Sequence, residues 1–429
     1  MFSFLNKQKE KGQAMIIAII FFICVSVATI LGLTNPVVRH IAMATSVVIS
    51  KESFYAAEAG VEDVIYRLKS GLPTAPSQTL AVGNHSVVTT VADELGNKVV
   101  TSSGEANNYF RKVEATLALG SGASFFYGIQ SDVGGIIIEN SASVEGNAYS
   151  NGTITSSVNG RIRGDVISAG PAGLLNSVRT TGVAHAHTIQ NSYVEKDAYY
   201  NTITGSTVLG LSYPGSSDQP TSTLPISDEM IEEWKSDAAL GGTITSPCPY
   251  MITSSIAIGP TKIDCDLEID GTNFTITLTG AIWVNGNISV KNSPTIQVSP
   301  SLQNRSVPII AHDPANMTSS GKITLENSAT FLGAGDNSYV LMVSQNSSAE
   351  SGGSEVAIDL KNSVTGKLLV YAGHGEIVLQ NSANLKEVSG FRLRLKNYAT
   401  VVYETGLASL LFSSGPSGGF DIFSWREVE

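Results

Sequence analysis

The sequence VEGNAYSN at residues 144–151 returns as VEKDAYYN at residues 194–201. Around this repeat, short apolar triplets alternate with glycine and asparagine turns, and helical periodicity is absent. An Asn-Ser pair after an apolar segment also recurs, with Asn397-Tyr398 as a variant. The asparagines of these pairs are Asn140, Asn191, Asn292, Asn327, Asn362 and Asn381. Internal repetition of this kind is typical of solenoids.

The repeats predict a parallel β-helix over residues 122–212 and again over residues 243–429, with a cap at the C-terminus. Strands of successive coils in such a body stack about 4.8 Å apart, so that asparagine side chains can bond along the stack. Glycine and asparagine also accept the positive φ angles that corners between faces need. A β-sandwich is the alternative, because it too has regular short strands separated by turns.

Residues 213–242 separate the two repeat regions. Residues 213–225 are rich in serine, proline and glycine and read as a linker. Ser227 then caps a short helix over residues 228–235, whose first turn is acidic. We expect this helix to cover an end of the solenoid. The closing segment FDIFSWRE at residues 420–427 predicts a final strand or cap of the β body, with Trp425 packed inward.

The N-terminus predicts a membrane-spanning helix. Residues 14–33, AMIIAIIFFICVSVATILGL, carry no charge, and 20 such residues match the thickness of a bilayer's hydrocarbon core. Lys7, Lys9 and Lys11 precede this run and predict a cytoplasmic N-terminus with an exported body. A cleaved secretory signal would have a shorter apolar run ending at a small-residue cleavage site, which this sequence lacks.

The helical pattern continues beyond Pro36 to about residue 71. Apolar residues recur at helical spacing from Phe54 to Leu68, and Gly71 with Pro73 supplies the stop. Three strand-like runs follow within residues 84–119, so residues 72–121 predict a small antiparallel sheet that packs on this apolar stripe. The fold class is therefore mostly β with one long N-terminal α-helix.

Lys11-Gly12 before an apolar run, a later proline, and FYAAEAGVE at residues 54–62 resemble the N-terminus of type IV pilin-like proteins, in particular minor pilins and pseudopilins. The resemblance covers about the first 70 residues. It implies that residues 1–12 are a leader, that prepilin peptidase cuts between Gly12 and Gln13, and that the helix packs with other subunits in a filament. The residues implied in that packing are Ile17, Pro36, Phe54 and Glu58.

One departure from the family pattern concerns Ile17, the fifth residue after the implied cut. Most pilins carry glutamate there, paired with a neighbour's N-terminal amine. A shaft subunit with isoleucine would bury that amine without its partner, which is costly. A tip subunit has no such neighbour, so the resemblance implies a minor or tip role. A plain membrane anchor outside any filament is the alternative.

Composition excludes some functions and leaves the cysteines open. The net charge of -11 argues against nucleic-acid binding, which needs a basic surface. Cys24 lies in the apolar run, whereas Cys248 and Cys265 lie in the β body, where an oxidising compartment would permit a disulfide. The sequence is equally consistent with Cys248 and Cys265 being two unlinked thiols.

Candidate chemistry is sparse. Asp264, Asp266, Glu268 and Asp270 alternate with apolar residues and would share one strand face, where Ca²⁺ could bind; a solvated face is the preferred interpretation. His185 and His187 also share a strand face but lack a third metal ligand. No nucleophile-elbow, phosphate-loop or CxxC motif is present.

The sequence thus predicts a non-enzymatic pilin-like subunit without a cofactor, in the inner or cytoplasmic membrane, with its body outside the cytoplasm and at the cell surface after assembly. Its expected partners are the membrane, other pilin-like subunits, prepilin peptidase and surface polysaccharide, in adhesion or assembly of a pilus or secretion pseudopilus. Two alternatives remain open: a surface-anchored carbohydrate-active β-helix enzyme, and a polymer-forming protein of bactofilin type.

Overall fold

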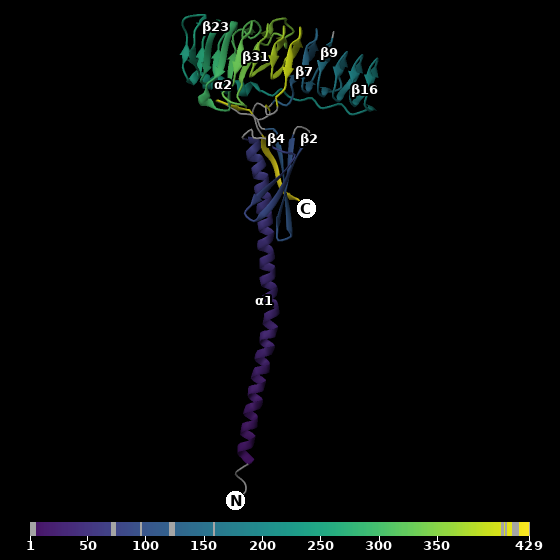
Figure 1. Ribbon diagram of the computed structural model, residues 1–429, viewed down its shortest axis with the longest axis vertical. Coiled ribbons are helices and arrows are strands. Elements are labelled where there is room, and N and C mark those ends of the chain that lie inside the picture. The colour runs from purple at the N-terminus through teal and green to yellow at the C-terminus, as the bar shows by residue number, and fades with distance from the viewer. Residues whose placement is uncertain are drawn as a thin grey trace. The chain divides into compact units, whose positions relative to one another are not determined.

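The computed structural model describes residues 6–69, 74–94, 97–119, 125–157, 159–404, 407, 410–413 and 420–428, with only the backbone of residues 6–13. The chain divides into two compact units. The first holds residues up to 67, residues 73–118 and residues 422–429; the second holds most of the remainder, residues 119–421. Each is described here by itself (Figure 1).

Helix α1, Asn6–Lys69, is a single helix of 64 residues that contains Pro36. Its N-terminal half is apolar and exposed, with Ile17 63% exposed, and α1 is long and apolar enough to cross a membrane. Its C-terminal part instead buries Ala57, Val61 and Val64 completely. The first half of α1 therefore suits a membrane and the second half suits packing against protein, as the sequence predicts.

The sheet of the first unit packs on that buried stripe. Its five strands are β1 (Ser77–Val82), β2 (His85–Glu94), β3 (Asn97–Ala106), β4 (Tyr109–Leu119) and β37 (Phe420–Val428), in that order. Strands β1 to β4 pair as antiparallel neighbours. At Gly104 of β3 a Cβ would lie 2.2 Å from the Ser53 carbonyl oxygen, so only glycine permits this approach of sheet and helix.

Strand β37 corrects the expectation that residues 420–427 cap the β body. They form the edge strand of the small sheet instead, where Arg426 Nε donates to Glu114 Oε1 at 3.0 Å. Trp425 is 36% exposed and is not packed inward. The physical reason lies in the path of the chain, because the body ends beside the place where it begins.

The body is a parallel β-helix with three faces, each a ladder of parallel strands around one apolar core. Within the described residues, every strand pair of this body is parallel, which excludes the β-sandwich alternative. Long strands bend at a corner and serve faces 1 and 2 (β14, β16, β32, β34) or faces 2 and 3 (β23, β25).

Face 1 contains β5 (Ile129–Ser131), β8 (Ala148–Ser150), β11 (Val166–Ser168), β14 (Ala184–Gln190), β16 (Ala198–Thr204), β18 (Ser212–Pro214), β19 (Thr243–Ile244), β22 (Thr261–Ile263), β24 (Ile282–Val284), β26 (Arg305–Ala311), β29 (Val340–Ser344), β32 (Leu368–Leu379) and β34 (Glu387–Leu395). Face 2 adds β6 (Ile136–Ile138), β9 (Ile154–Ser156), β12 (Leu174–Asn176), β20 (Tyr250–Ile252), β23 (Leu267–Leu278), β25 (Ile288–Val298), β27 (Ile323–Leu325) and β30 (Val356–Leu360). Face 3 adds β7 (Ser143–Glu145), β10 (Arg161–Ile162), β13 (Arg179–Thr180), β15 (Tyr193–Val194), β17 (Thr207–Val208), β21 (Ile256–Ile258), β28 (Thr330–Leu332), β31 (Thr365–Gly366), β33 (Asn384–Leu385) and β35 (Thr400–Val402). Outside these ladders, η1 (Pro300–Leu302) is a 3-10 turn and β36 (Leu411–Phe412) pairs with the start of β26.

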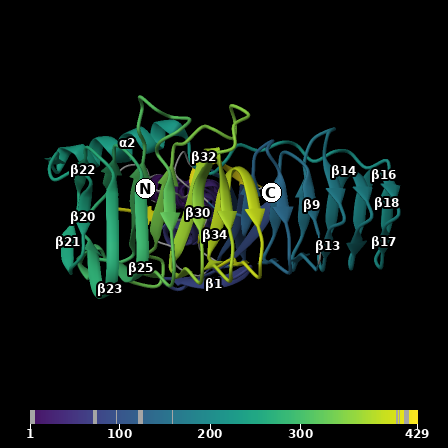
Figure 2. The same ribbon diagram turned by 90° about the horizontal axis from the view of Figure 1, so that it is seen from above.

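The chain enters this solenoid in its middle. Strands β5 to β18 build coils outward to one end, and strands β19 to β35 build coils from the other end back to the middle (Figure 2). There β34 pairs with β5 and β6, and β35 pairs with β7. We call this joint the seam. It joins the two repeat regions into one continuous body. Along that body, the coils of residues 243–402 come before the coils of residues 129–214.

A ladder of asparagine side chains crosses the seam. Asn381 donates to Asn362 at 2.9 Å, Asn397 to Asn381 at 3.1 Å, and Asn140 to Asn397 at 3.0 Å. All seven asparagines singled out in the sequence have positive φ, including Asn381 at 53°. The prediction that these residues turn the corners is confirmed for all seven, and bonding along the stack is confirmed for Asn140, Asn362, Asn381 and Asn397.

Residues 215–227, which we call the strap, and helix α2 (Asp228–Leu240) connect the two ends of the body. Helix α2 buries Met230, Ile231 and Trp234 against face 1 residues such as Ile310 and Leu341. It lies along a side of the solenoid across several coils, so the expectation that it covers an end is wrong (Figure 2). Beneath α2, face 1 is thus buried on both sides, and β26, β29 and β32 are almost continuously apolar there.

Substitution of Asn381 tests the corner ladder. Asn381→Gly keeps the positive φ and removes two side-chain bonds, which we expect to cost about 1 kcal/mol of unfolding free energy. Asn381→Val removes the same bonds and adds the strain of a β-branched residue at positive φ, roughly 1–2 kcal/mol more. Thermal unfolding of the full chain measures both, and equal melting temperatures for the two variants would contradict this account.

Candidate functional site

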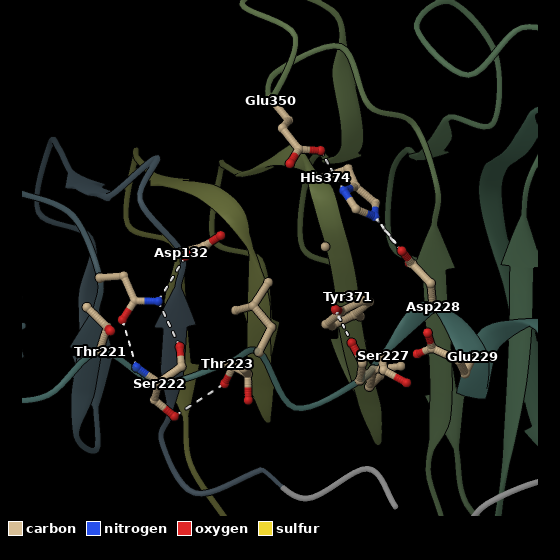
Figure 3. A pocket seen from close by; sticks show the side chains of 14 residues that line it. Asp132, Thr221, Ser222, Thr223, Ser227, Asp228, Glu229, Glu350, Tyr371 and His374 are labelled. Atoms are coloured by element: carbon tan, nitrogen blue, oxygen red, sulfur yellow. Dashed lines mark hydrogen bonds and ion pairs between the residues drawn. The ribbon is translucent and has the colours of Figure 1, made fainter. Parts of the chain in front are cut away.

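A polar cavity of about 600 Å³ opens where the strap meets α2 on face 1. It is lined by the strap from Thr221 to Ser227, by the first turn of α2, and by residues of the coils on either side of the seam (Figure 3). Asp132 and Asn151 come from the first region, whereas Glu350 and His374 come from the second. The cavity thus joins parts of the body that lie far apart in the sequence.

The strap is fixed to face 1 by side chains of successive coils. Asn151 exchanges two hydrogen bonds with the backbone of Ser222, at 2.7 and 3.0 Å. The Tyr149 hydroxyl donates to the Pro220 carbonyl at 2.6 Å, and Gln130 donates to the Thr223 carbonyl at 2.9 Å. The Tyr371 hydroxyl donates to the Ile226 carbonyl. Because the strap has no ladder of its own, these bonds satisfy its backbone.

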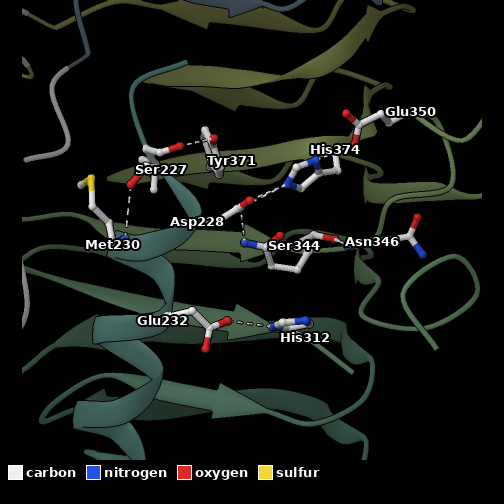
Figure 4. A network of polar contacts seen from close by, with 12 residues as sticks. Ser227, Asp228, Met230, Glu232, His312, Ser344, Asn346, Glu350, Tyr371 and His374 are labelled. Carbon is white, nitrogen blue, oxygen red and sulfur yellow. Dashed lines mark hydrogen bonds and ion pairs between the residues drawn. The ribbon is translucent and has the colours of Figure 1, made fainter. Parts of the chain in front are cut away.

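Helix α2 begins as the sequence predicts. Ser227 has an extended backbone and its hydroxyl oxygen accepts the Met230 N–H, an N-cap. Asp228 and Glu229 occupy the first turn, where the helix dipole favours negative charge. The cap places the Asp228 carboxylate at the edge of the cavity, facing His374 (Figure 4).

His374 is held between two carboxylates. Its Nδ1 lies 2.6 Å from Glu350 Oε2, and its Nε2 lies 3.1 Å from both Asp228 carboxylate oxygens. Burial disfavours the charged ring, but the hydrogen bonds to Asp228 and Glu350 outweigh it and raise the pKa of His374. In the charged form that this raised pKa favours, both nitrogens donate to the carboxylates and no lone pair is left to take a proton or bind a metal ion. The group is a clamp between α2 and the coils.

A second histidine, His312, follows β26 and packs against the middle of α2. His312 is 7% exposed, and burial together with the charge of Lys235 lowers its pKa. Neither ring nitrogen has a hydrogen-bond partner in the described part of the chain, and Glu232 Oε1 is 3.7 Å from its Nδ1 (Figure 4). Lys235 bonds Glu232 at 2.7 Å and covers the Trp283 ring. This cluster fastens α2 to the body.

The four predicted acids do not form one strand face. Asp264 and Asp266 lie in the corner between β22 and β23, and only Glu268 and Asp270 lie on β23. Asp264 pairs with Lys262 at 2.9 Å, Asp266 accepts the Asn287 N–H at 2.7 Å, and Asp270 accepts Asn292. The bonds of Asp266 and Asp270 join successive coils, whereas the Lys262–Asp264 pair lies within one coil. Within the described residues, no three His, Cys, Asp or Glu side chains are placed to hold a metal ion.

His185 and His187 share face 1, as the sequence predicts, and both lie beneath the strap. His187 Nδ1 is 3.1 Å from Asp218, and the His185 ring stacks on Tyr199 at 4.5 Å. Tyr213 continues that stack at 4.5 Å to the last coil. The two histidines therefore position the strap. Among the described residues, no third side chain lies where it could complete a metal site with them.

Cys248 and Cys265 form a disulfide that joins the first coil of the second region to the next. Cys24 is an exposed thiol of α1. Of the residues implied in filament packing, Ile17 is exposed on α1, Pro36 lies inside the helix, and Phe54 and Glu58 are half-buried beside the small sheet. Gly12 and Gln13 belong to α1, but their side chains lie outside the described residues.

The clamp could not be predicted from the sequence. Nothing near His374 marks it as part of a site, because Asp228 is 146 residues and Glu350 is 24 residues away in the chain. Only the path of the strap back along face 1 brings Asp228 to His374. No local pattern marks such a contact, although the helix cap at Ser227 locates one of its members.

No family description matches this chain, and no curated protein resembles it in sequence. Among solved structures, it is similar to the competence-associated pilin ComZ from Thermus thermophilus. The match has 10% identity and a TM-score of 0.24, and covers 89% of this chain and 97% of that one. A TM-score this low supports no conclusion about fold or function.

The clamp has a defined pH dependence. Because the folded pKa of His374 is raised, its contribution to stability is complete below pH 6.5, the unfolded value, and is lost as pH rises through the folded pKa. We expect His374→Gln to lower the unfolding free energy by up to about 1 kcal/mol at pH 5.5 and by less at pH 9. Melting temperatures across this range measure the difference. A difference that grows with pH would contradict the clamp.

Proposed function

We propose that this chain is a pilin-like, membrane-anchored structural subunit that presents a β-helical body outside the cytoplasm. The observation that carries the proposal is the division of α1. Its first half exposes an uninterrupted apolar surface, whereas its second half packs closely on an antiparallel sheet. A water-soluble protein rarely exposes such a surface, but lipid or neighbouring helices can cover it.

The pilin-like reading gives the N-terminal residues defined roles. Residues 1–12 are the cytoplasmic leader, prepilin peptidase cuts between Gly12 and Gln13, and the exposed stretch of α1 packs with helices of other subunits. Ile17 in place of an acid favours a minor or tip position, because a tip subunit has no neighbouring amine to neutralise. Priming of assembly and adhesion are the roles that such a position offers.

The body supports a binding or structural role more than a catalytic one. The histidine at the cavity beside the strap lies between two carboxylates, which favour its charged form, and a charged imidazole has no free lone pair with which to act as a base. The acids that a carbohydrate-active enzyme would use are engaged in corner bonds. Faces 2 and 3 carry polar side chains such as Thr155, Ser289 and Thr324 among charged ones such as Asp359 and Arg394, and these can bond the hydroxyl groups of surface polysaccharide.

N-terminal sequencing tests the proposal. Expressed with prepilin peptidase, the full chain is expected to start at Gln13; without it, or with Gly12→Leu, the chain is expected to keep its leader. The matched control is Gly32→Leu, because Gly32 lies in the same helix with open space around it. A chain that keeps Met1 in the presence of active peptidase would contradict the filament role and leave only a membrane anchor.

A further inference from the structure

Within the part of the chain that the structure describes, the two ends of the β-helix are unpaired on all three faces. At one end, which we call end A, the last strands are Thr202–Thr204 of β16, β17 and β18, and each pairs on its inner side only. At the other end, end B, the same holds for β19, β20 and β21. Figure 2 shows these strands at opposite extremes of the body.

Both ends lack the charged residues that normally protect open strand edges. Natural sheets place charged side chains, above all lysine, at such edges to prevent pairing with another chain. Residues 198–217 around end A contain no Asp, Glu, Lys or Arg, and neither do residues 238–261 around end B. Pro214 removes one donor from an edge strand of end A, whereas Pro247 and Pro249 of end B lie in the turn between β19 and β20 and leave the donors of both strands in place. The inner coils, in contrast, carry charge pairs such as Lys361 with Glu326.

The ends also expose apolar side chains. If the strand register of the body continued from end A of one copy into end B of another, these side chains would face each other. Continuing the strand pairs of face 3 by one coil sets Val208 against Ile256 and Leu209 against Ala257. Continuing face 2 sets Ile203 against Tyr250 and Thr204 against Met251. Leu209 is 62% exposed and Met251 is 52% exposed. When end A of one chain lies above end B of another, the open strand edges can therefore pair and the exposed apolar side chains can pack on one another.

We propose that end A of one copy stacks on end B of a second copy, so that their bodies form one continuous β-helix. All strand pairs remain parallel in this arrangement, whereas contact between two identical ends would reverse the strand direction. The seam is the internal precedent, since β34 and β35 already stack on β5, β6 and β7 through the same kind of parallel joint. The Cys248–Cys265 disulfide fixes the coil that forms end B.

This contact is head-to-tail, so it leaves one end open at each extremity and grows with concentration. It uses the body alone and does not depend on N-terminal processing or on α1. Its failure is therefore distinguishable from failure of the pilin-like role. The partner is a second copy of this chain.

Two blocked variants of the full chain in detergent test the proposal. Thr204→Lys with Leu209→Lys places charge at end A, and Met251→Lys with Ala257→Lys places charge at end B; all four side chains point away from the core. Val133→Lys is the matched control, because Val133 is 64% exposed on an inner coil. Sedimentation velocity follows association as concentration is raised.

The unmodified chain and the control are expected to form a concentration-dependent series of multimers. Each blocked variant alone should stay monomeric, with at least a tenfold shift in the concentration of half-association. A mixture of the two should form dimers with one copy of each and nothing larger, since each copy keeps one open end. The dimers would also show that the unmodified ends remain folded.

Three results would overturn the proposal: an unmodified chain that stays monomeric at the highest concentration, a blocked variant that assembles like the control, or a mixture that forms longer chains. Association through α1 would be unaffected by either pair of lysines and gives the second result.

Discussion

The parallel seam between β34 and β35 on one side and β5, β6 and β7 on the other is the constraint on which the rest of the body depends. The chain enters at the middle, so without this joint the two repeat regions would be separate short solenoids. Backbone bonds such as Leu393 N–H to Gly135 and Tyr403 N–H to Glu145 close it, each contributing about 1 kcal/mol net. Asparagine bonds between Asn140 and Asn397 continue the corner ladder across it.

Several features follow from this path of the chain. The body's first described residue, Phe125, accepts a bond from the Tyr403 hydroxyl, so the chain enters and leaves at one place and its last strand can join the small sheet. The connection between the two far ends must run the length of the solenoid, which makes the strap and α2 a cover for face 1. The clamp at His374 then ties that cover to the coils. Among the described residues of the body, the strap and α2 leave faces 2 and 3 and both ends open.

Much of this could be predicted from the sequence, and the parts that could not share a cause. The apolar run and the stripe from Phe54 to Leu68 predict α1, because helix periodicity is local. The Asn-Ser pairs predict the corners for the same reason, since the side chain and the φ angle belong to one residue. The seam, the return of residues 420–428 and the contact of Asp228 with His374 join residues that no local pattern links. These three contacts depend on the order in which the chain builds the coils, and the composition of each coil does not reveal that order.

The most direct measurement of the seam is a disulfide between two residues that face each other across it. Ser143 and Thr400 are direct partners with hydroxyl oxygens 3.5 Å apart, so Ser143→Cys with Thr400→Cys in a Cys24→Ser chain is expected to bridge within one molecule. The pair Ser143→Cys with Thr330→Cys, several coils apart on face 3, should stay reduced. Peptide mass spectrometry of dilute, mildly oxidised protein distinguishes them. Reduced thiols at positions 143 and 400, or bridging of the control pair instead, would contradict the account.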